Sequence, residues 1–144
     1  MPLTNHAEEM LQRGSALLAP LLLRHGFSFE ILDAGSSSGG HFASGEFKRG
    51  PRRLGFHFRH SLGIVTYSLA DRSMTHQQYM RFVHGGLGAS HYPGFSDDPL
   101  DAFRHLLLDL EQHGGDFLGG TDESLLRCIG EALAMPNTKS GPPD

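Results

Sequence analysis

The sequence has few of the residues that cross-link small proteins or hold metal clusters. Cys128 is the only cysteine among 144 residues, and tryptophan is absent. A single thiol excludes an intrachain disulfide framework and any zinc or iron–sulfur site that needs several cysteines. The ten phenylalanines and the aliphatic residues must therefore supply the core.

Long hydrophobic runs are also missing. The longest run near the N-terminus, residues 16–23, spans eight residues and contains Pro20, whereas a helix that crosses a bilayer needs about 20. Glu8 and Glu9 stand where a secretory signal would carry positive charge. We therefore expect a cytoplasmic protein and no membrane among its partners.

The charge balance is modest. Twelve Lys and Arg residues face 16 Asp and Glu residues, for a formal net charge of −4, which argues against a dedicated nucleic-acid-binding protein. The length is that of one domain. We expect one domain over residues 1–135, and a flexible tail over residues 136–144, which are rich in Pro, Gly and small polar residues.

Residues 3–25 carry Leu and Met side chains at helical spacing, which predicts an N-terminal helix. Thr4 or Asn5 can cap it, and Gly26 can end it. Pro20 lies inside this stretch and removes one backbone hydrogen bond. A kink one turn before Pro20, or a break into two shorter helices, is therefore expected.

The apolar period changes to two after residue 26. Alternation predicts strands over residues 27–31, 41–48 and 53–59, and a fourth strand over residues 64–69 after a reversal at residues 61–62. Consecutive strands without intervening helices predict an antiparallel meander.

The reversal at residues 61–62 also predicts a register between the third and fourth strands. It places six large residues on one face of the sheet, as the pairs Phe58 with Val65, Phe56 with Tyr67, and Leu54 with Leu69.

The C-terminal half is predicted to be mainly helical. A short helix is expected over residues 75–83, an amphipathic helix after the Asp98-Pro99 start signal, and a last helix after Thr121. The predicted fold is α+β, with an N-terminal helix, a four-stranded antiparallel meander, and two to three C-terminal helices packed on one face of the sheet.

A basic stretch in and around the third strand is the first candidate site. Six basic or titratable residues fall within twelve positions, namely Arg49, Arg52, Arg53, His57, Arg59 and His60. The binding surface is assigned to Arg53, His57, Arg59 and His60. Such a surface can attract an acidic partner or a phosphate backbone, although ordinary solvated strand residues also explain the pattern.

The glycine-rich loop over residues 84–95 is the second candidate. His84, His91 and Tyr92 can transfer protons, and glycines allow a ligand to approach the backbone closely. Neither a dinucleotide-binding nor a P-loop glycine pattern is present. The alternative interpretation is an ordered loop packed by its aromatic residues.

Asp101, His105 and Asp109 are spaced four residues apart along the amphipathic helix. Two carboxylates and an imidazole can bind a divalent metal, but one helix rarely supplies a complete ligand set. The alternative interpretation is a solvated polar face opposite the leucine stripe. If the helix does contribute to a site, Asp101 and His105 join His84, His91 and Tyr92 of the loop in an alternative ligand site. No metal or other cofactor is assigned.

These patterns leave three functional hypotheses. The leading one is a small intracellular protein-binding protein of inhibitor, immunity or adaptor type, without catalytic activity, because no complete catalytic set can be traced in the sequence. Its partner is another protein, with self-association as an alternative. The second hypothesis is a small-ligand or metal-dependent enzyme centred on residues 84–95. The third is a weak nucleic-acid binder that uses the basic strand.

Overall fold

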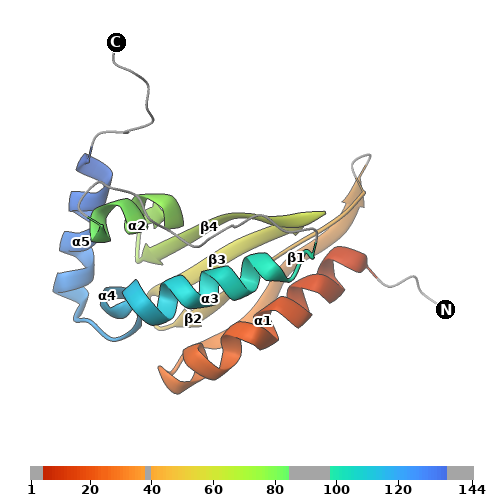
Figure 1. The fold of residues 1–144 in the computed structure, drawn as a ribbon, viewed down its shortest axis with the longest axis horizontal. Helices are drawn as coiled ribbons and strands as arrows, with labels where there is room; N and C mark the ends of the chain where they lie inside the picture. Colours follow the sequence, from red (N-terminus) through yellow and green to blue (C-terminus); the bar gives the residue numbers. More distant parts are fainter. Residues whose placement is uncertain (1–4, 38–39, 85–97, 136–144) are drawn as a thin grey trace, which may run out of the picture.

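The computed structural model describes residues 5–37, 40–84 and 98–135 (Figure 1). The helices are α1 (His6–Arg24), α2 (His76–Val83), α3 (Asp101–His113), α4 (Gly115–Leu118) and α5 (Asp122–Ala134), and the strands are β1 (Ser28–Ser37), β2 (Gly40–Arg49), β3 (Arg52–Arg59), β4 (Ser61–Leu69) and β5 (Arg72–Thr75). The fold is α+β, with an N-terminal helix, an antiparallel sheet and C-terminal helices, as the sequence predicted. The proposed tail over residues 136–144 lies outside the described residues.

The sheet has five strands in the order β1-β2-β3-β4-β5, so the prediction of four strands was wrong by one. β5 pairs antiparallel with β4, from Thr66 opposite Thr75 to Leu69 opposite Arg72. It is four residues long, and Met74 is its single buried side chain. A strand this short shows no recognisable alternation in the sequence.

Helix α1 runs without interruption from His6 to Arg24, so the alternative of a break into two shorter helices was wrong. Asn5 caps the helix, because its side-chain oxygen accepts a hydrogen bond from the Glu8 amide at 2.9 Å. Pro20 deprives the Ala16 carbonyl of its helical donor. Both residues are exposed, so water can reach that carbonyl and the helix continues without a buried unsatisfied group.

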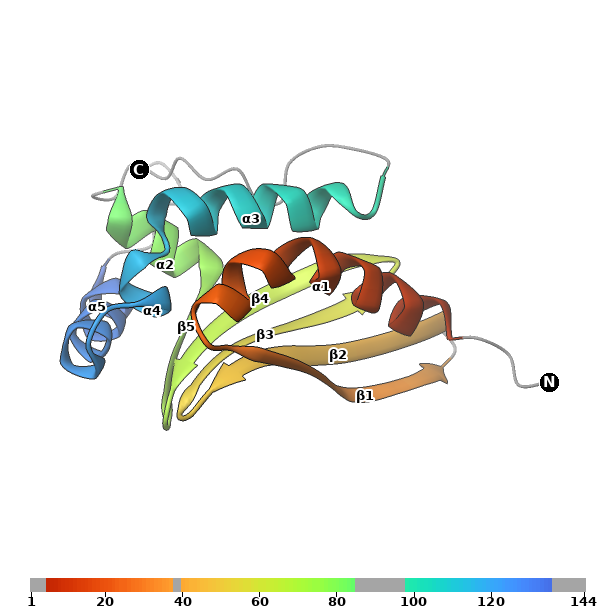
Figure 2. The ribbon, with the colours of Figure 1, turned by 90° about the horizontal axis from the view of Figure 1, so that it is seen from below.

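Helices α1 and α3 lie side by side over one face of the sheet, while α2, α4 and α5 gather at its β5 end (Figure 2). Gly14 allows α1 and α3 to approach closely, because a Cβ atom at this position would lie 2.3 Å from the buried ring of Phe103. The described helices and the helix-facing side of the sheet share one hydrophobic cluster. None of the described helices is long and apolar enough to cross a membrane.

The predicted register of β3 and β4 was wrong by two residues. Phe56 pairs with Val65 and Leu54 with Tyr67, and the chain reverses at His60, whose φ is 65°. Because a shift of two residues keeps each side chain on the same face, all six large residues are still buried on the helix side. They are Leu54, Phe56, Phe58, Val65, Tyr67 and Leu69.

Candidate binding surface

One face of the sheet carries none of the described helices. Helices α1 and α3 cover the opposite face, and α2, α4 and α5 lie at the β5 end (Figure 2). We call the uncovered face the outer face. Strand residues point alternately to the two sides of a sheet, so every second residue of β1 to β5 belongs to it.

The outer face of β3 carries Arg53, His57 and Arg59, three of the four residues assigned to the binding surface. Burial alternates regularly along this strand: Leu54, Phe56 and Phe58 are buried on the helix side, whereas Arg53 and His57 are exposed and Arg59 is half-buried. The fourth residue, His60, is exposed in the turn that follows. The structure therefore places the four residues along one strand and its turn.

Phe42 of β2 joins His57 and Arg59 on the outer face. The imidazole of His57 stacks on the Phe42 ring with centroids 6.1 Å apart, and the Arg59 guanidinium carbon lies 5.4 Å from the ring centroid. We call these three residues the aromatic–basic cluster. Phe42 was not among the residues predicted for the binding surface. Its odd separation from the buried Phe47 was the available signal, since it puts the two rings on opposite faces.

A β-bulge next to His57 exposes an aliphatic side chain. Phe56 pairs with Val65 and Phe58 with Leu62, so β4 has one residue more than β3 over this interval. Ile64 lies in the bulge and is 72% exposed. The bulge therefore adds an apolar contact point beside the basic residues of β3.

Charge is unevenly distributed over the outer face. Glu30 and Glu46 pair across β1 and β2, and Glu30 is 4.0 Å from Lys48. On β3, β4 and β5, by contrast, the charged side chains of this face are Arg53 and Arg59. Within the described ranges, no carboxylate lies within ion-pair distance of either arginine.

Arg49 and Arg52, which the sequence grouped with this basic stretch, lie on the helix side instead. Arg52 is 3% exposed and donates hydrogen bonds to the carbonyls of Phe117, at 2.7 Å, and Gly120. Arg49 donates to the carbonyl of Leu118 at 2.9 Å. Both arginines therefore tie α4 and the start of α5 to the β2–β3 hairpin, and they are not available to a partner.

The alternative ligand site is only partly described. His91 and Tyr92 lie outside the described residues. His84 follows α2, and its ring lies 4.5 Å, centroid to centroid, from that of His113 at the end of α3. Asp101 and His105 lie on the first two turns of α3, where Asp101 pairs with Arg104.

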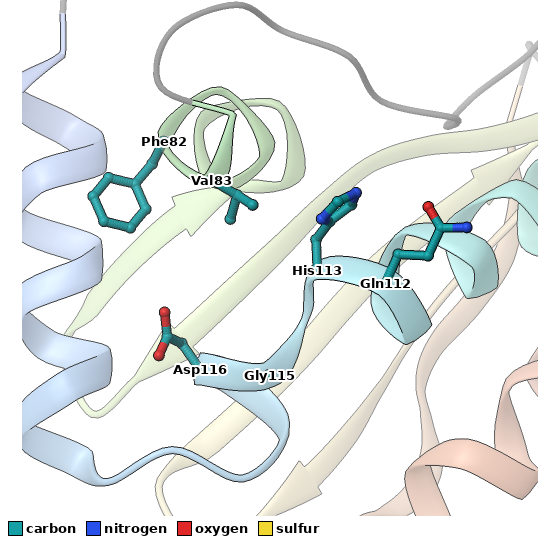
Figure 3. A pocket seen from close by; sticks show the side chains of 6 residues that line it. All are labelled: Phe82, Val83, Gln112, His113, Gly115 and Asp116. Carbon is teal, nitrogen blue, oxygen red and sulfur yellow. The ribbon is translucent and has the colours of Figure 1, made fainter.

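A shallow cavity of about 520 Å³ has His113, the ring partner of His84, in its lining (Figure 3). It is lined by Phe82, Val83, Gln112, His113, Gly115 and Asp116. The Nε2 atom of His84 is buried and has no hydrogen-bond partner among the described residues. In the described part of the chain, no three His, Cys, Asp or Glu side chains come close enough together to hold a metal ion.

Asp109 does not belong to a solvated polar face, which corrects the sequence interpretation. It is fully buried, and its Oδ2 lies 2.8 Å from Nε2 of His76, whose Nδ1 lies 2.7 Å from the hydroxyl of Tyr67. We call these three residues the buried relay. The available signal was that Asp109 lies three residues after the buried Leu106 on the same helix.

The buried relay has the carboxylate–imidazole–hydroxyl order of a catalytic triad. Tyr67 and Asp109 are 0% exposed, however, and His76 is 3% exposed. A substrate cannot reach a hydroxyl at this depth. The relay therefore links β4, α2 and α3 as a structural element.

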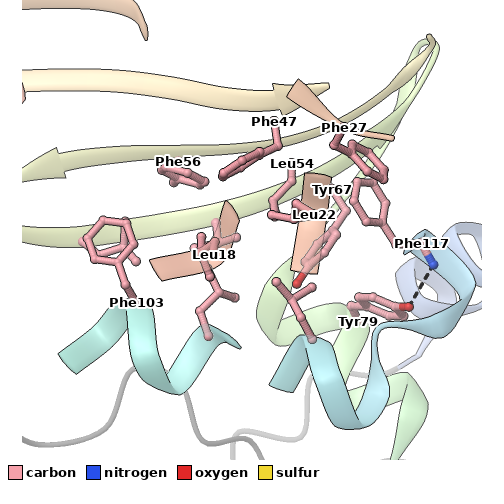
Figure 4. Packing of buried hydrophobic residues seen from close by; sticks show 14 of the residues in the cluster. Leu18, Leu22, Phe27, Phe47, Leu54, Phe56, Tyr67, Tyr79, Phe103 and Phe117 are labelled. Atoms are coloured by element: carbon pink, nitrogen blue, oxygen red, sulfur yellow. Dashed lines mark hydrogen bonds between the residues drawn. The ribbon is translucent and has the colours of Figure 1, made fainter. Parts of the chain in front are cut away.

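Burial favours the neutral forms of two further side chains, Cys128 and Tyr79. Burial raises the pKa of Cys128 to about 12, and it raises the pKa of Tyr79 above its usual range. The Tyr79 hydroxyl accepts a hydrogen bond from the Phe117 amide at 3.2 Å (Figure 4). Because Cys128 is 2% exposed in α5, it is a core residue and not an accessible nucleophile.

Comparisons with protein-family models, with curated proteins and with solved structures found no match.

Proposed function

We propose that this protein acts by binding another protein through the outer face of its sheet, without catalysing a reaction. The observation that carries this proposal is an uncovered face on which Arg53 and Arg59 have no carboxylate partner among the described residues and Ile64 is 72% exposed. An inhibitor, an immunity-type protein or an adaptor would use such a face.

The composition and the size of the face support this function. Arginine and aromatic residues are enriched where proteins contact one another, and Phe42 and Arg59 supply both within the aromatic–basic cluster. Five strands about 4.8 Å apart, each with about eight residues, give a face of roughly 600 Å². A typical partner contributes about 800 Å² to a stable interface, so the face would supply about three quarters of that area and residues at its rim the rest.

An affinity pull-down from cells that express the protein naturally tests the proposal. The wild-type chain is compared with Arg53→Glu/Arg59→Glu, and bound proteins are identified by mass spectrometry. Arg24→Glu/Arg127→Glu is the matched control, because both of these arginines are exposed on helices and the change in net charge is the same.

We expect one stoichiometric partner to bind the wild type and the control but not the Arg53→Glu/Arg59→Glu variant. Equal recovery of that partner by all three proteins would contradict the assignment of the surface. Recovery of no partner by any of them would contradict the binding function.

A small-ligand site at the cavity beside His84 is the second candidate function, and it corresponds to the enzyme hypothesis. The observation that favours it is the buried Nε2 atom of His84, which has no partner among the described residues and lies next to His113. Thermal-shift measurements with Zn²⁺, Ni²⁺ and inorganic phosphate test it. A rise in melting temperature that His84→Ala abolishes supports this site, and no shift with any of the three argues against it.

A further inference from the structure

We infer that the segment bound by the outer face is acidic and carries an apolar side chain between its carboxylates. This inference rests on the proposed protein-binding function and adds the chemistry of the partner. It follows from the positions of Arg53, Arg59 and Ile64 along the β3–β4 half of the face.

The two arginines set the spacing of the carboxylates. Arg53 and Arg59 are six residues apart on one regular strand, which corresponds to about 20 Å. Both guanidinium groups lack a carboxylate partner among the described residues. An extended segment along β3, with acidic residues about six positions apart, would supply one carboxylate to each arginine.

The apolar contact point lies between these two positions. Ile64 occupies the bulge opposite His57, and His57 lies between Arg53 and Arg59 on β3. A leucine-sized side chain of the bound segment would cover Ile64 and remove apolar surface from water. The aromatic–basic cluster holds His57 and Arg59 against the Phe42 ring, so less side-chain freedom is lost on binding.

The same charge distribution favours a protein segment over a nucleic acid. Glu30 and Glu46 lie on the neighbouring strands of the outer face, and Asp33 pairs with Ser44 on that face. A nucleic acid carries a negative charge at every nucleotide, so a nucleic acid that contacted both β1–β2 and β3–β4 would be repelled by these carboxylates. A peptide with only a few carboxylates can pair them with the arginines of β3 without placing any of them next to Glu30 or Asp33.

Fluorescence anisotropy with defined probes tests this inference. The probes are fluorescein-labelled peptides that contain Glu-Ser-Leu-Ser-Leu-Ser-Glu, Gln-Ser-Leu-Ser-Leu-Ser-Gln or Lys-Ser-Leu-Ser-Leu-Ser-Lys, in which the two end residues are six positions apart and point to the same side when the peptide is extended. A 20-nucleotide single-stranded DNA is the fourth probe. The proteins are the wild type, Arg53→Glu/Arg59→Glu, the conservative variant Arg53→Lys/Arg59→Lys, and the control Arg24→Glu/Arg127→Glu. Circular dichroism first verifies that all four are folded.

We expect the glutamate peptide to bind the wild type at least tenfold more tightly than the glutamine peptide. Arg53→Glu/Arg59→Glu should weaken that binding at least tenfold and should bind the lysine peptide instead, while the lysine variant and the control retain the preference for the glutamate peptide. Equal binding of the glutamate and glutamine peptides, or tighter binding of the DNA, would overturn the inference.

The outcomes separate this inference from the proposed function. A stoichiometric protein captured through Arg53 and Arg59 in the pull-down, together with no preference for the glutamate peptide, would reject the acidic segment and keep the binding function. Failure of both experiments would reject both.

Discussion

Replacing Asp109 with asparagine should lower the free energy of unfolding, and the size of the decrease should show whether His76 in the buried relay is neutral or protonated. The substitution preserves volume, so no cavity is created at this fully buried position. What changes is the contact between the carboxylate and Nε2 of His76, which measures 2.8 Å. A carboxylate acceptor is replaced by a neutral amide, and the negative charge is removed.

Two magnitudes are possible, and they differ enough to be separated. If His76 is neutral, a charge-assisted hydrogen bond becomes an ordinary one, at a cost of about 1–2 kcal/mol. If His76 carries a proton, its buried charge loses its counterion, at a cost of about 3–5 kcal/mol. For a domain of this size, each kcal/mol lowers the melting temperature by about 2–4 °C.

Urea denaturation followed by circular dichroism measures the free energy of unfolding by linear extrapolation. Glu111→Gln is the matched control, because Glu111 is exposed on the same helix. Tyr67→Phe should cost about 0.5–1.5 kcal/mol by removing the hydroxyl at the other end of the relay. Its effect and that of Asp109→Asn should not add, since the two side chains share His76. If Asp109→Asn costs no more than Glu111→Gln, the relay does not stabilise the fold.

Three further substitutions test the packing and the buried groups. Gly14→Ala should lower the free energy of unfolding by about 1–3 kcal/mol despite the better helix propensity of alanine, because the added Cβ would overlap the Phe103 ring. Gly130→Ala, where the nearest atom is 4.0 Å away, should instead raise it by about 0.5–1 kcal/mol. Urea titrations that ranked the two variants the other way would refute this packing. Arg52→Ala should cost at least about 2 kcal/mol and speed hydrogen exchange over residues 115–121; unchanged exchange would refute its anchoring role. Burial raises the pKa of Tyr79 from its usual 10.0, so the folded state retains this proton longer than the unfolded state and the free energy of unfolding should fall as pH rises above about 10. Tyr79→Phe should reduce that slope between about pH 10 and 12, and an unchanged slope would exclude Tyr79 as its source.

Side-chain periodicity was sufficient to predict which face of β3 and of β4 is buried. The six large residues of β3 and β4 lie on the helix side, as predicted, although the register differs by two residues. The turn geometry could not be predicted, because it depends on His60 adopting a positive φ, which is uncommon outside glycine. The bulge at Ile64 is likewise set by strand pairing, and no local pattern in the sequence indicates it.

The candidate surface was predictable in its β3 residues but not in its boundaries. Alternation places Arg53, His57 and Arg59 on one face of their strand, and this does not depend on which strands pair with it. Arg49 and Arg52 belong to the same basic stretch of the sequence, yet they donate hydrogen bonds to carbonyl groups about 70 residues further along the chain. Such long-range contacts depend on where α4 packs, which local periodicity does not encode.

Arg52 and Arg53 are adjacent in the chain but contribute differently to the stability of the fold. Arg52 holds α4 and the start of α5 in place, whereas the next residue points away from the core and contributes little to it. Substitutions at exposed positions usually change stability by no more than about 0.5 kcal/mol. Substitutions at Arg53, His57 or Ile64 should therefore change the chemistry of the outer face while the fold stays intact, and under the proposed binding function a change of partner would not require a change of core.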